Sequence, residues 1–485
     1  MRLRLPFLKT GYRMPEPRVA CELGFGQGVS TAIHTAAAPL DWWATDFNPS
    51  HVAHGQELIA SFQGGAHLFD QSFDEFCHRN DLPEFDFIGL HGVWSWVSDD
   101  NHRTIVDFVR RKLKVGGVLY ISYNTQPGWA ARIPLRHIID EHFKRLTRSG
   151  TNLLDRIDDA FAFAARLLEQ NPAYMVANPR VAEQFHWIRT ANRHYLAHEL
   201  FNQAWRSYSF SEISDWLSAA KVTFVGSANP LDHVAFPHLN EGQRVFLDAI
   251  PDPTYRETVR DFMINQQFRQ DYWVKGPQRL DQPARNTRLR DQRVVLMIPR
   301  AQISLKIQGA QGETPLDPEL YNPLLDLLAD HQPLSIGELE RKLTSRGVTL
   351  DRLLESLLVL NANSGISLIQ EEPLIQQAKP RCAILNRHLL EQARHSDRIN
   401  HLASPVTGGG VRVPRLEQLF LLSASQGADT PREWADQASQ WLDVPAEGPS
   451  AQDRDEPAET QKTERFERAQ RFVDTLTILR SLGIG

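Results

Sequence analysis

Residues 20–33, with the sequence ACELGFGQGVSTAI, combine an apolar run, three glycines at alternate positions and a stretch suited to a helix. This order predicts a strand, a tight turn and a helix. The glycines do not form a phosphate-binding P-loop, because Val29 and Ser30 stand where that motif requires Lys and Ser or Thr. Their G-x-G-x-G spacing also differs from the G-x-G-x-x-G of dinucleotide-binding proteins. Two interpretations remain: a loop that lets a nucleoside ligand approach the backbone, or an ordinary turn.

Around this stretch, residues 18–125 alternate between short apolar runs and helix-like segments. The alternation predicts an α/β fold with a parallel, doubly wound sheet, whose ligand sites lie at the carboxyl ends of the strands. Residues 135–220 have helical periodicity instead, and residues 257–273 (ETVRDFMINQQFRQDYW) are predicted to form a further helix. Three helices and a strand are predicted over residues 315–370, which indicates a winged-helix-like α+β module.

Acidic residues at the ends of the next two predicted strands favour the nucleoside interpretation. Asp46 ends the strand WWATD, 22 residues after Gly24, where a carboxylate can accept both hydroxyls of a ribose. Asp70 ends the strand AHLFD, where it can accept from an adenine amino group. Phe69 or Phe73 would then supply the ring that packs on the base.

Five segments carry a resemblance to class I S-adenosylmethionine-dependent methyltransferases. They are ELGFGQG (22–28), TDFNP (45–49), FDFIGLHGVWSW (85–96), LKVGGVLYISYN (113–124) and TQPGWA (125–130). HGVWSW followed by YN-x-x-PGW is similar to one branch of them, which carries a methyltransferase regulatory domain and includes rickettsial surface-protein lysine methyltransferases. Residues 195–226 resemble the regulatory segment itself. The resemblance covers about residues 18–275.

This resemblance implies an α/β, Rossmann-like class I methyltransferase domain followed by a helical regulatory region, and the pattern over residues 315–370 adds the winged-helix-like α+β accessory domain. The expected parts are a methyltransferase domain (1–145), a mostly helical regulatory region (146–300), a winged-helix-like module (301–375), an accessory region (376–445), a disordered linker (446–465) and a C-terminal helix (466–485). The linker is expected from its polar, proline-containing composition.

The resemblance also implies S-adenosylmethionine as the cofactor and assigns residues to it. The glycines would line its methionine portion and ribose, Glu22 would lie beneath their loop, and Asp70 with its neighbours would hold the adenine. The cofactor-binding residues so implied are Glu22, Gly24, Gly26, Gly28, Asp46, Phe47, Asp70, Gln71, His91 and Gly92. The catalytic candidates are His91, Trp94, Tyr123 and Asn124, and no metal site is expected.

Several candidates also have a structural interpretation. Trp94, Trp96 and Trp129 would either pack in the core or form an aromatic rim that desolvates an alkyl-amine chain. His91 would either bond a backbone carbonyl or stand beside the sulfonium methyl. Asn124 would either bind a substrate amine or form a turn before Pro127.

Two further pairs of polar residues are less suited to catalysis. His198 and Glu199 are adjacent in a helical stretch and so face different directions, which makes them a poor catalytic pair, although one of the two could face the cleft. Arg269 and Asp271 are expected to form an internal ion pair.

Composition narrows the class of protein. The chain has 485 residues, a net charge of −6 and three cysteines, with neither a C-x-x-C pair nor a long apolar run. We therefore expect a cytoplasmic protein that binds neither nucleic acid nor membrane. The winged-helix-like module is expected to contact protein, in a homodimer or another complex, because its helices carry several carboxylates and few cations.

The expected activity is methyl transfer to lysine side chains of a protein acceptor. A small-molecule acceptor is the alternative, since accessory regions can merely dimerise. A second alternative is a weak cofactor-binding module, because the chain begins too late to contain the tyrosine- and proline-rich segment that covers the cofactor in relatives. A further departure is Trp94, which stands where relatives often have tyrosine.

Overall fold

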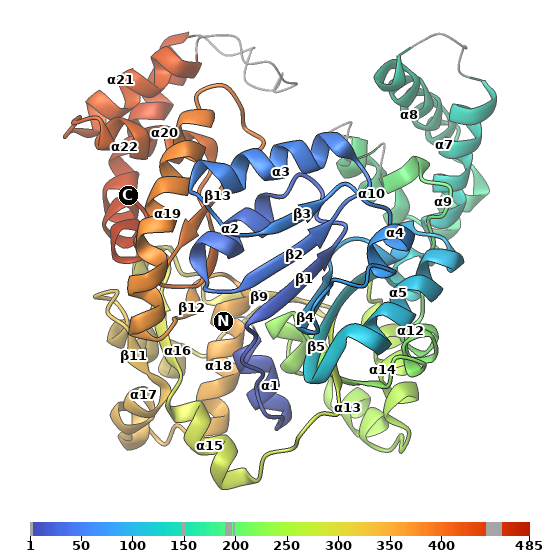
Figure 1. Cartoon of the computed structure of the whole chain (residues 1–485), viewed down its shortest axis with the longest axis horizontal. Coiled ribbons are helices and arrows are strands. Elements are labelled where there is room, and N and C mark those ends of the chain that lie inside the picture. Colours follow the sequence, from blue (N-terminus) through green and yellow to red (C-terminus); the bar gives the residue numbers. More distant parts are fainter. Residues whose placement is uncertain (1–2, 147–151, 190–195, 197–198, 443–457) are drawn as a thin grey trace.

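A seven-stranded sheet forms the centre of the molecule in this computed structural model (Figure 1). The structure describes residues 3–146, 152–189, 196, 199–442 and 458–485. The strand order is β3-β2-β1-β4-β5-β7-β6. The strands are β1 (Val19–Leu23), β2 (Asp41–Thr45), β3 (His67–Phe69), β4 (Phe85–Leu90), β5 (Leu113–Asn124), β6 (Val222–Ser227) and β7 (Phe268–Lys275). The first five strands are parallel, whereas β7 runs antiparallel between β5 and β6.

Helices cover both faces of this sheet, which confirms the doubly wound prediction. On one face lie α1 (Arg4–Thr10), α2 (Val29–Ala37) and α3 (Pro49–Ser61), and on the other lie α4 (Phe73–Cys77), α5 (Asp99–Lys112) and α12 (Phe210–Ser218). Alternate residues of β5 divide between the two faces, as the strand period requires. Val118 packs with Phe7 of α1, whereas Leu119 and Ile121 pack with the cluster that contains Phe108 of α5.

The last two strands correct two expectations from the sequence. The boundary expected at residue 145 does not bound the sheet, because β6 and β7 come from residues 222–275. The helix expected over residues 257–273 is also wrong in its second half. Helix α14 (Pro253–Ile264) ends where Asn265 adopts a left-handed conformation with φ 52°, and the chain then enters β7.

A helical bundle follows the carboxyl end of β5. It begins with α6 (Gln126–Ala130) and continues through α7 (Ile133–Arg145), α8 (Leu153–Glu169), α9 (Ala173–Ala177) and α10 (Arg180–Arg189). Its own core includes Ile139, Phe161 and Phe185. We call α7–α10 the helical cap, since α7 starts only a few residues after the edge of the sheet where ligands are expected.

Residues 293–368 build the module that was expected to resemble a winged helix. A three-stranded antiparallel sheet, ordered β11 (Leu334–Ser335), β8 (Arg293–Leu296), β12 (Ile366–Leu368), packs with α16 (Pro318–Leu327), α17 (Ile336–Leu343) and α18 (Leu350–Ala362). The module starts at β8, before the expected residue 301. A capping box of Ser335 and Glu338 begins α17, and one of Ser209 and Glu212 begins α12.

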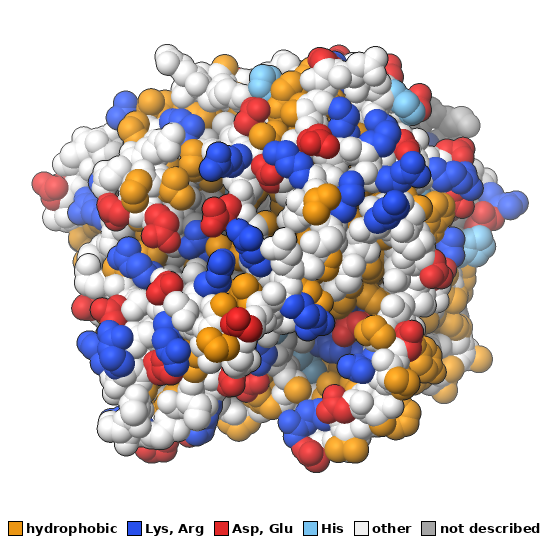
Figure 2. Space-filling view, turned by 60° about the horizontal axis from the view of Figure 1, so that its bottom comes forward, with side chains coloured by type: hydrophobic (Ala, Val, Ile, Leu, Met, Phe, Trp, Pro, Cys, Tyr) orange, Lys and Arg blue, Asp and Glu red, His pale blue; other side chains and the backbone are white. Residues whose placement is uncertain are grey.

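Two arginines, one in α15 (Gln282–Arg290) and one in α18, form ion pairs with carboxylates of this module. Arg290 binds Glu340 at 2.6 Å, and Arg352 binds Asp317 at 2.7 Å. Figure 2 shows the same mixture of basic and acidic side chains over one face of the molecule.

The C-terminal part packs against the helix that follows the glycine loop. It comprises α19 (Glu372–Gln392), the hairpin β13 (His401–Ser404) and β14 (Gly409–Arg412), α20 (Arg415–Ser425), α21 (Pro431–Leu442) and α22 (Ala458–Ser481). One apolar cluster joins Ile33 and Ala36 of α2 to Leu385 of α19 and Phe420 of α20. Figure 1 shows α19 beside α2, and the buried Gln370 Nε2 donates to the carbonyl of Ala37 at 2.8 Å.

The final helix docks on this part, as the sequence predicted, through residues such as Phe472 and Leu479. Its start differs from the prediction. The linker expected over 446–465 ends earlier, because α22 begins at Ala458. The rest of that expectation, residues 446–457, lies outside the described residues. The remaining elements are η1 (Trp94–Trp96), η2 (Pro230–His233), α13 (Glu241–Asp248), α15 (Gln282–Arg290), η3 (Arg300–Gln302), β9 (Lys306–Gly309), β10 (Gly312–Pro315) and η4 (Thr344–Arg346).

Candidate active site

The glycine loop connects β1 to α2, which confirms the predicted order of strand, turn and helix. Gly24, Gly26 and Gly28 all have positive φ, at 76°, 59° and 75°. A β-carbon on Gly24 would lie 2.7 Å from Cγ2 of Val93, and one on Gly28 would lie 2.7 Å from Cα of Gly55. A β-carbon on Gly26 would meet no atom within 4 Å. Two of the glycines therefore permit close packing, while the middle one lies against open space where a ligand can approach the backbone.

This difference predicts unequal effects of substitution on stability. Gly28→Ala should lower the free energy of unfolding by about 2 kcal/mol, because the new methyl group would press on the backbone of α3 as well as strain φ. Gly26→Ala is the matched control and should cost about 1 kcal/mol, from the backbone conformation alone. Urea denaturation followed by circular dichroism measures both. Equal losses for the two variants would contradict the packing role of Gly28.

Asp46 lies directly beside the loop at the end of β2. Its carboxylate accepts the N–H of Gly26 at 2.9 Å and the N–H of Asn48 at 3.0 Å, and His51 Nδ1 lies 3.2 Å away. The residue is 7% exposed. Each carboxylate oxygen has two acceptor sites, so Oδ2 keeps one site for a hydroxyl, and Oδ1, which already accepts from Asn48, keeps one when the His51 ring does not donate to it. The structure therefore places this carboxylate at the loop, as the sequence predicted.

Glu22 lies beneath the loop and ties β1 to the first turn of α2. It accepts from Thr31 Oγ1 at 2.6 Å and from Ser30 Oγ at 3.0 Å. Burial raises the pKa of Glu22, while these two hydroxyl hydrogen bonds act to lower it. The carboxyl group thus fixes the geometry of the loop from below.

Two aromatic rings lie near the loop where an adenine base would need them. Phe47, next to Asp46, is 80% exposed. Phe73 reaches the loop, since its Cζ would lie 3.7 Å from a β-carbon on Gly24. Phe69 instead stacks on Trp43 with ring centres 6.0 Å apart. An exposed aromatic ring next to this carboxylate suits the face of a base.

The end of β3 supplies the two polar residues that were expected near the adenine. Asp70 is exposed, and no hydrogen bond of its carboxylate occurs within the described residues. Gln71 is half-buried, with its carbonyl accepting from Thr45 Oγ1 at 2.5 Å and its side chain accepting from Arg79 at 3.3 Å. The backbone carbonyl and the side-chain amide oxygen of Gln71 are therefore both hydrogen-bonded within the protein, whereas Asp70 faces solvent.

His91 and Gly92 follow β4 and meet the residues of β5. Nδ1 of His91 lies 3.0 Å from the hydroxyl of Tyr120, and the two rings stack with centres 5.9 Å apart. The N–H of Gly92 donates to Ser122 Oγ at 2.8 Å. Tyr120 and Ser122 were not among the predicted residues. Strand alternation would have found them, because they share one face of β5 with Asn124.

Trp94 is not on the wall of a pocket, which corrects its assignment as a catalytic residue. Its side chain is completely buried and stacks on His102 of α5, with ring centres 4.1 Å apart. Trp216 of α12 contacts the ring of Trp94 edge-on. Burial lowers the pKa of His102, whose Nε2 lies 2.9 Å from the carbonyl oxygen of Trp94. This group of rings packs α5 against α12 and is part of the core.

Tyr123 is also structural, contrary to its assignment as a catalytic candidate. It is completely buried and donates its hydroxyl hydrogen to Asp271 of β7 at 2.8 Å. Burial and the charge of Asp271 raise the pKa of Tyr123 well above its ordinary value. Asp271 in turn binds Arg269 at 3.0 Å, which confirms the predicted internal ion pair.

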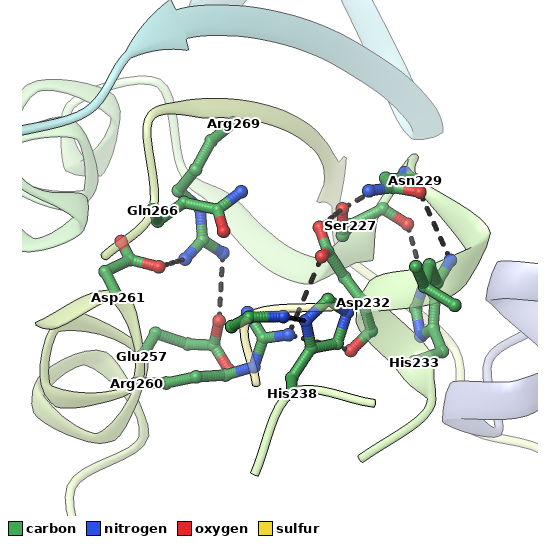
Figure 3. A network of polar contacts seen from close by, with 12 residues as sticks. Ser227, Asn229, Asp232, His233, His238, Glu257, Arg260, Asp261, Gln266 and Arg269 are labelled. Carbon is green, nitrogen blue, oxygen red and sulfur yellow. Dashed lines mark hydrogen bonds and ion pairs between the residues drawn. The ribbon is translucent and has the colours of Figure 1, made fainter. Parts of the chain in front are cut away.

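Arg269 continues this network toward α14. Figure 3 shows its guanidinium group directed at Asp261 and Glu257, with distances of 2.7 and 2.9 Å. A neighbouring set of contacts holds the end of β6, where Ser227 Oγ donates to Asp232 at 2.7 Å (Figure 3). These buried charges lock β7 between β5 and α14.

Asn124 ends β5 and is almost buried, at 4% exposure. Its Nδ2 donates to Oε1 of Glu199 at 3.3 Å, and its backbone N–H donates to Ser95 Oγ at 2.8 Å. Glu199 thus lies at the carboxyl edge of the sheet. His198, its neighbour, lies outside the described residues.

A cavity of about 310 Å³ adjoins this end of β5. It lies between α6, α7 and residues 205–207, which are joined to β5 because Tyr208 N donates to the carbonyl of Asn124. Its lining residues are Gln126, Ile133, Arg136, His137, Trp205, Arg206 and Ser207. Trp129 packs against the lining residue Trp205, with ring centres 4.8 Å apart. Trp96, the third tryptophan expected at an aromatic rim, is half-buried. A larger cavity of about 570 Å³ lies between α5 and α12.

Neither a membrane span nor a metal centre was found in the described parts of the chain. No described helix is long and apolar enough to cross a bilayer. No three described side chains of His, Cys, Asp or Glu are grouped as metal ligands.

Comparisons with known proteins agree with this geometry. Residues 192–275 match the model of a family described as a predicted methyltransferase regulatory domain, which spans β6 and β7. An uncharacterized protein of Synechocystis, sll1526, is 36% identical over 468 residues, covering 96% of this chain and 91% of that protein. An uncharacterized protein of Rickettsia prowazekii, RP789, is 26% identical over 200 residues, or 40% of this chain and 35% of that protein.

A solved structure has the same fold over nearly the whole chain. It is PKMT2 from Rickettsia typhi in complex with AdoHcy, with a TM-score of 0.68 and 18% sequence identity, covering 99% of this chain and 98% of that chain. At this identity the likeness concerns the fold, including the helical cap and the C-terminal part.

Proposed function

The chain belongs to the family of the Synechocystis protein sll1526, with the fold of S-adenosylmethionine-dependent methyltransferases, and we propose that it transfers a methyl group to lysine side chains of a protein. The observation that carries this proposal is the contact between the glycine loop and Asp46. The carboxylate holds the N–H of Gly26 at 2.9 Å while open space lies above that glycine. This arrangement offers ribose acceptors and an accessible backbone at one place.

The residues at this edge fit S-adenosylmethionine. Asp46 would bind the ribose hydroxyls, Phe47 would cover the base, and Glu22 would support the loop under the amino-acid portion. When bound, the cofactor supplies a methyl group that is already activated by its positively charged sulfur. The protein then has to align the acceptor nitrogen with that methyl group and hold it there.

A lysine acceptor must first lose a proton, because its ordinary pKa of about 10.4 keeps the amine charged at neutral pH. His91 is the group at the end of β4 that can take this proton. In the tautomer whose Nδ1–H donates to the Tyr120 hydroxyl, Nε2 carries the accepting lone pair. Asn124 and Glu199 supply polar and negative groups at the neighbouring strand end, where an amine can be bound before transfer.

Labelled cofactor tests this proposal directly. The full chain is incubated with S-adenosylmethionine that carries an isotopic methyl group and with a lysate of the organism that makes the protein. We expect label on lysine residues of one or a few proteins by mass spectrometry, and none with the Asp46→Ala variant. Label only in small molecules would show the alternative acceptor class, and cofactor binding without any transfer would show a binding module.

A further inference from the structure

The cavity at the end of β5 has an uneven charge. Arg136, Arg206 and His137 are among its lining residues, whereas no described Asp or Glu lines it. A cavity whose ionisable lining groups are all bases favours an anionic occupant over a cationic one. The lysine that is to be methylated would therefore not be the group that fills it.

Arg136 is held in a fixed orientation at this cavity. Its guanidinium group lies over the ring of Trp205 at 4.3 Å, and its Nη2 donates to the carbonyl of Asn202 at 3.0 Å. Burial lowers the pKa of Arg136, which means that its charge is partly desolvated. A stacked, preoriented guanidinium is suited to a carboxylate, which it can bind with two parallel hydrogen bonds.

The carboxylates of Asp140 and Glu199 act on the charge of Arg136, and each also has another partner. Asp140 binds Lys144 at 2.6 Å, and Glu199 accepts from Asn124. Arg206 is bound to Glu212 at 2.6 Å, so its charge is largely balanced. Arg136 and the exposed His137 therefore provide most of the attraction for an anion that enters from outside.

We propose that this cavity is a subsite for an Asp or Glu side chain of the protein acceptor, close in sequence to the lysine that receives the methyl group. The inference rests on the proposed function and adds the acceptor's local chemistry to it. The position of the cavity supports it, since Gln126 follows β5 by two residues and α7 belongs to the helical cap. An acceptor chain that reaches the strand ends would pass this opening.

Peptides with a single lysine and either Glu or Gln at the flanking positions test this preference. We expect kcat/KM to be about tenfold higher for the Glu peptides, the effect of one charge-assisted contact. His137→Glu and Arg136→Met should each bring this ratio close to one. His395→Glu makes the same charge change at an exposed position in the turn after α19 and should leave the ratio as in the unmodified protein. Thermal unfolding shows whether each variant is folded.

Methylation of Gln and Glu peptides at equal rates would overturn the subsite and leave the proposed function standing. If no peptide is methylated, the lysate experiment decides the protein-acceptor proposal, and binding decides the subsite separately. A fluorescein-labelled Glu-containing peptide is then titrated with the full chain and followed by anisotropy. Binding that weakens about tenfold in His137→Glu supports the subsite, whereas equal binding to both proteins overturns it.

Discussion

Replacing Asp46 by alanine should weaken the binding of S-adenosylmethionine by roughly 100-fold, or about 2.7 kcal/mol. The carboxylate of Asp46 is nearly buried. In the variant, both ribose hydroxyls of the cofactor would lose it as their hydrogen-bond acceptor. The variant also loses the acceptor for the N–H groups of Gly26 and Asn48, so the loop that should receive the ligand is less well held. Isothermal titration calorimetry with the full chain measures this change.

His51→Ala is the control for this experiment. It removes only the ring nitrogen that lies 3.2 Å from Asp46 and leaves the carboxylate in place. We expect a change of less than about threefold in affinity, because the half-exposed histidine acts on the ligand only through Asp46. Unchanged affinity in a folded Asp46→Ala protein would remove this residue from the cofactor site.

The glycine turn and the carboxylate beside it could be predicted from the sequence. The turn at Gly24–Gly28 and the carboxylate at the end of the next strand follow from chain order, because parallel strands bring their carboxyl ends to one edge. Trp94 was not predictable in the same way. The direction of its ring is decided by His102, which lies in the following helix, and by Trp216, which is distant in the sequence.

Strand β7 was predicted as helix because its pattern is ambiguous. Arg269 and Asp271 interrupt an apolar run, and charged residues are rare inside a central strand. They are tolerated here because Tyr123, Asp261 and Glu257 bind them, and none of these partners is a sequence neighbour within the strand. A boundary at 145 followed from missing this strand, since β6 and β7 complete the sheet. Cutting the chain there would expose the edge of β5.

Arg269→Met should lower the free energy of unfolding by about 3–5 kcal/mol, the usual cost of removing one partner from a buried ion pair. Arg269 is 3% exposed and binds Asp261, Asp271 and Glu257 within 3.0 Å. Methionine fills much of the same volume, so the loss would come from charge rather than from packing. Arg103→Met is the control, because its ion pair with Asp100 is exposed on both sides and should contribute almost nothing. Urea denaturation compares the two variants.

The loss in free energy of unfolding caused by Arg269→Met should depend on pH in a defined direction. Burial already raises the pKa of Asp261, to about 7, and Arg269 acts to lower it. Without the guanidinium group the pKa values of Asp261 and Asp271 would rise further, so the folded state would bind more protons than the unfolded state. A group with a raised folded-state pKa stabilises the fold below its unfolded pKa and loses that effect as pH rises through the folded value. The difference between the unmodified protein and Arg269→Met should therefore be smaller at pH 5 than at pH 8. A difference that stays constant between pH 8 and pH 5 would mean that the loss comes from packing around the methionine and not from unpaired carboxylates.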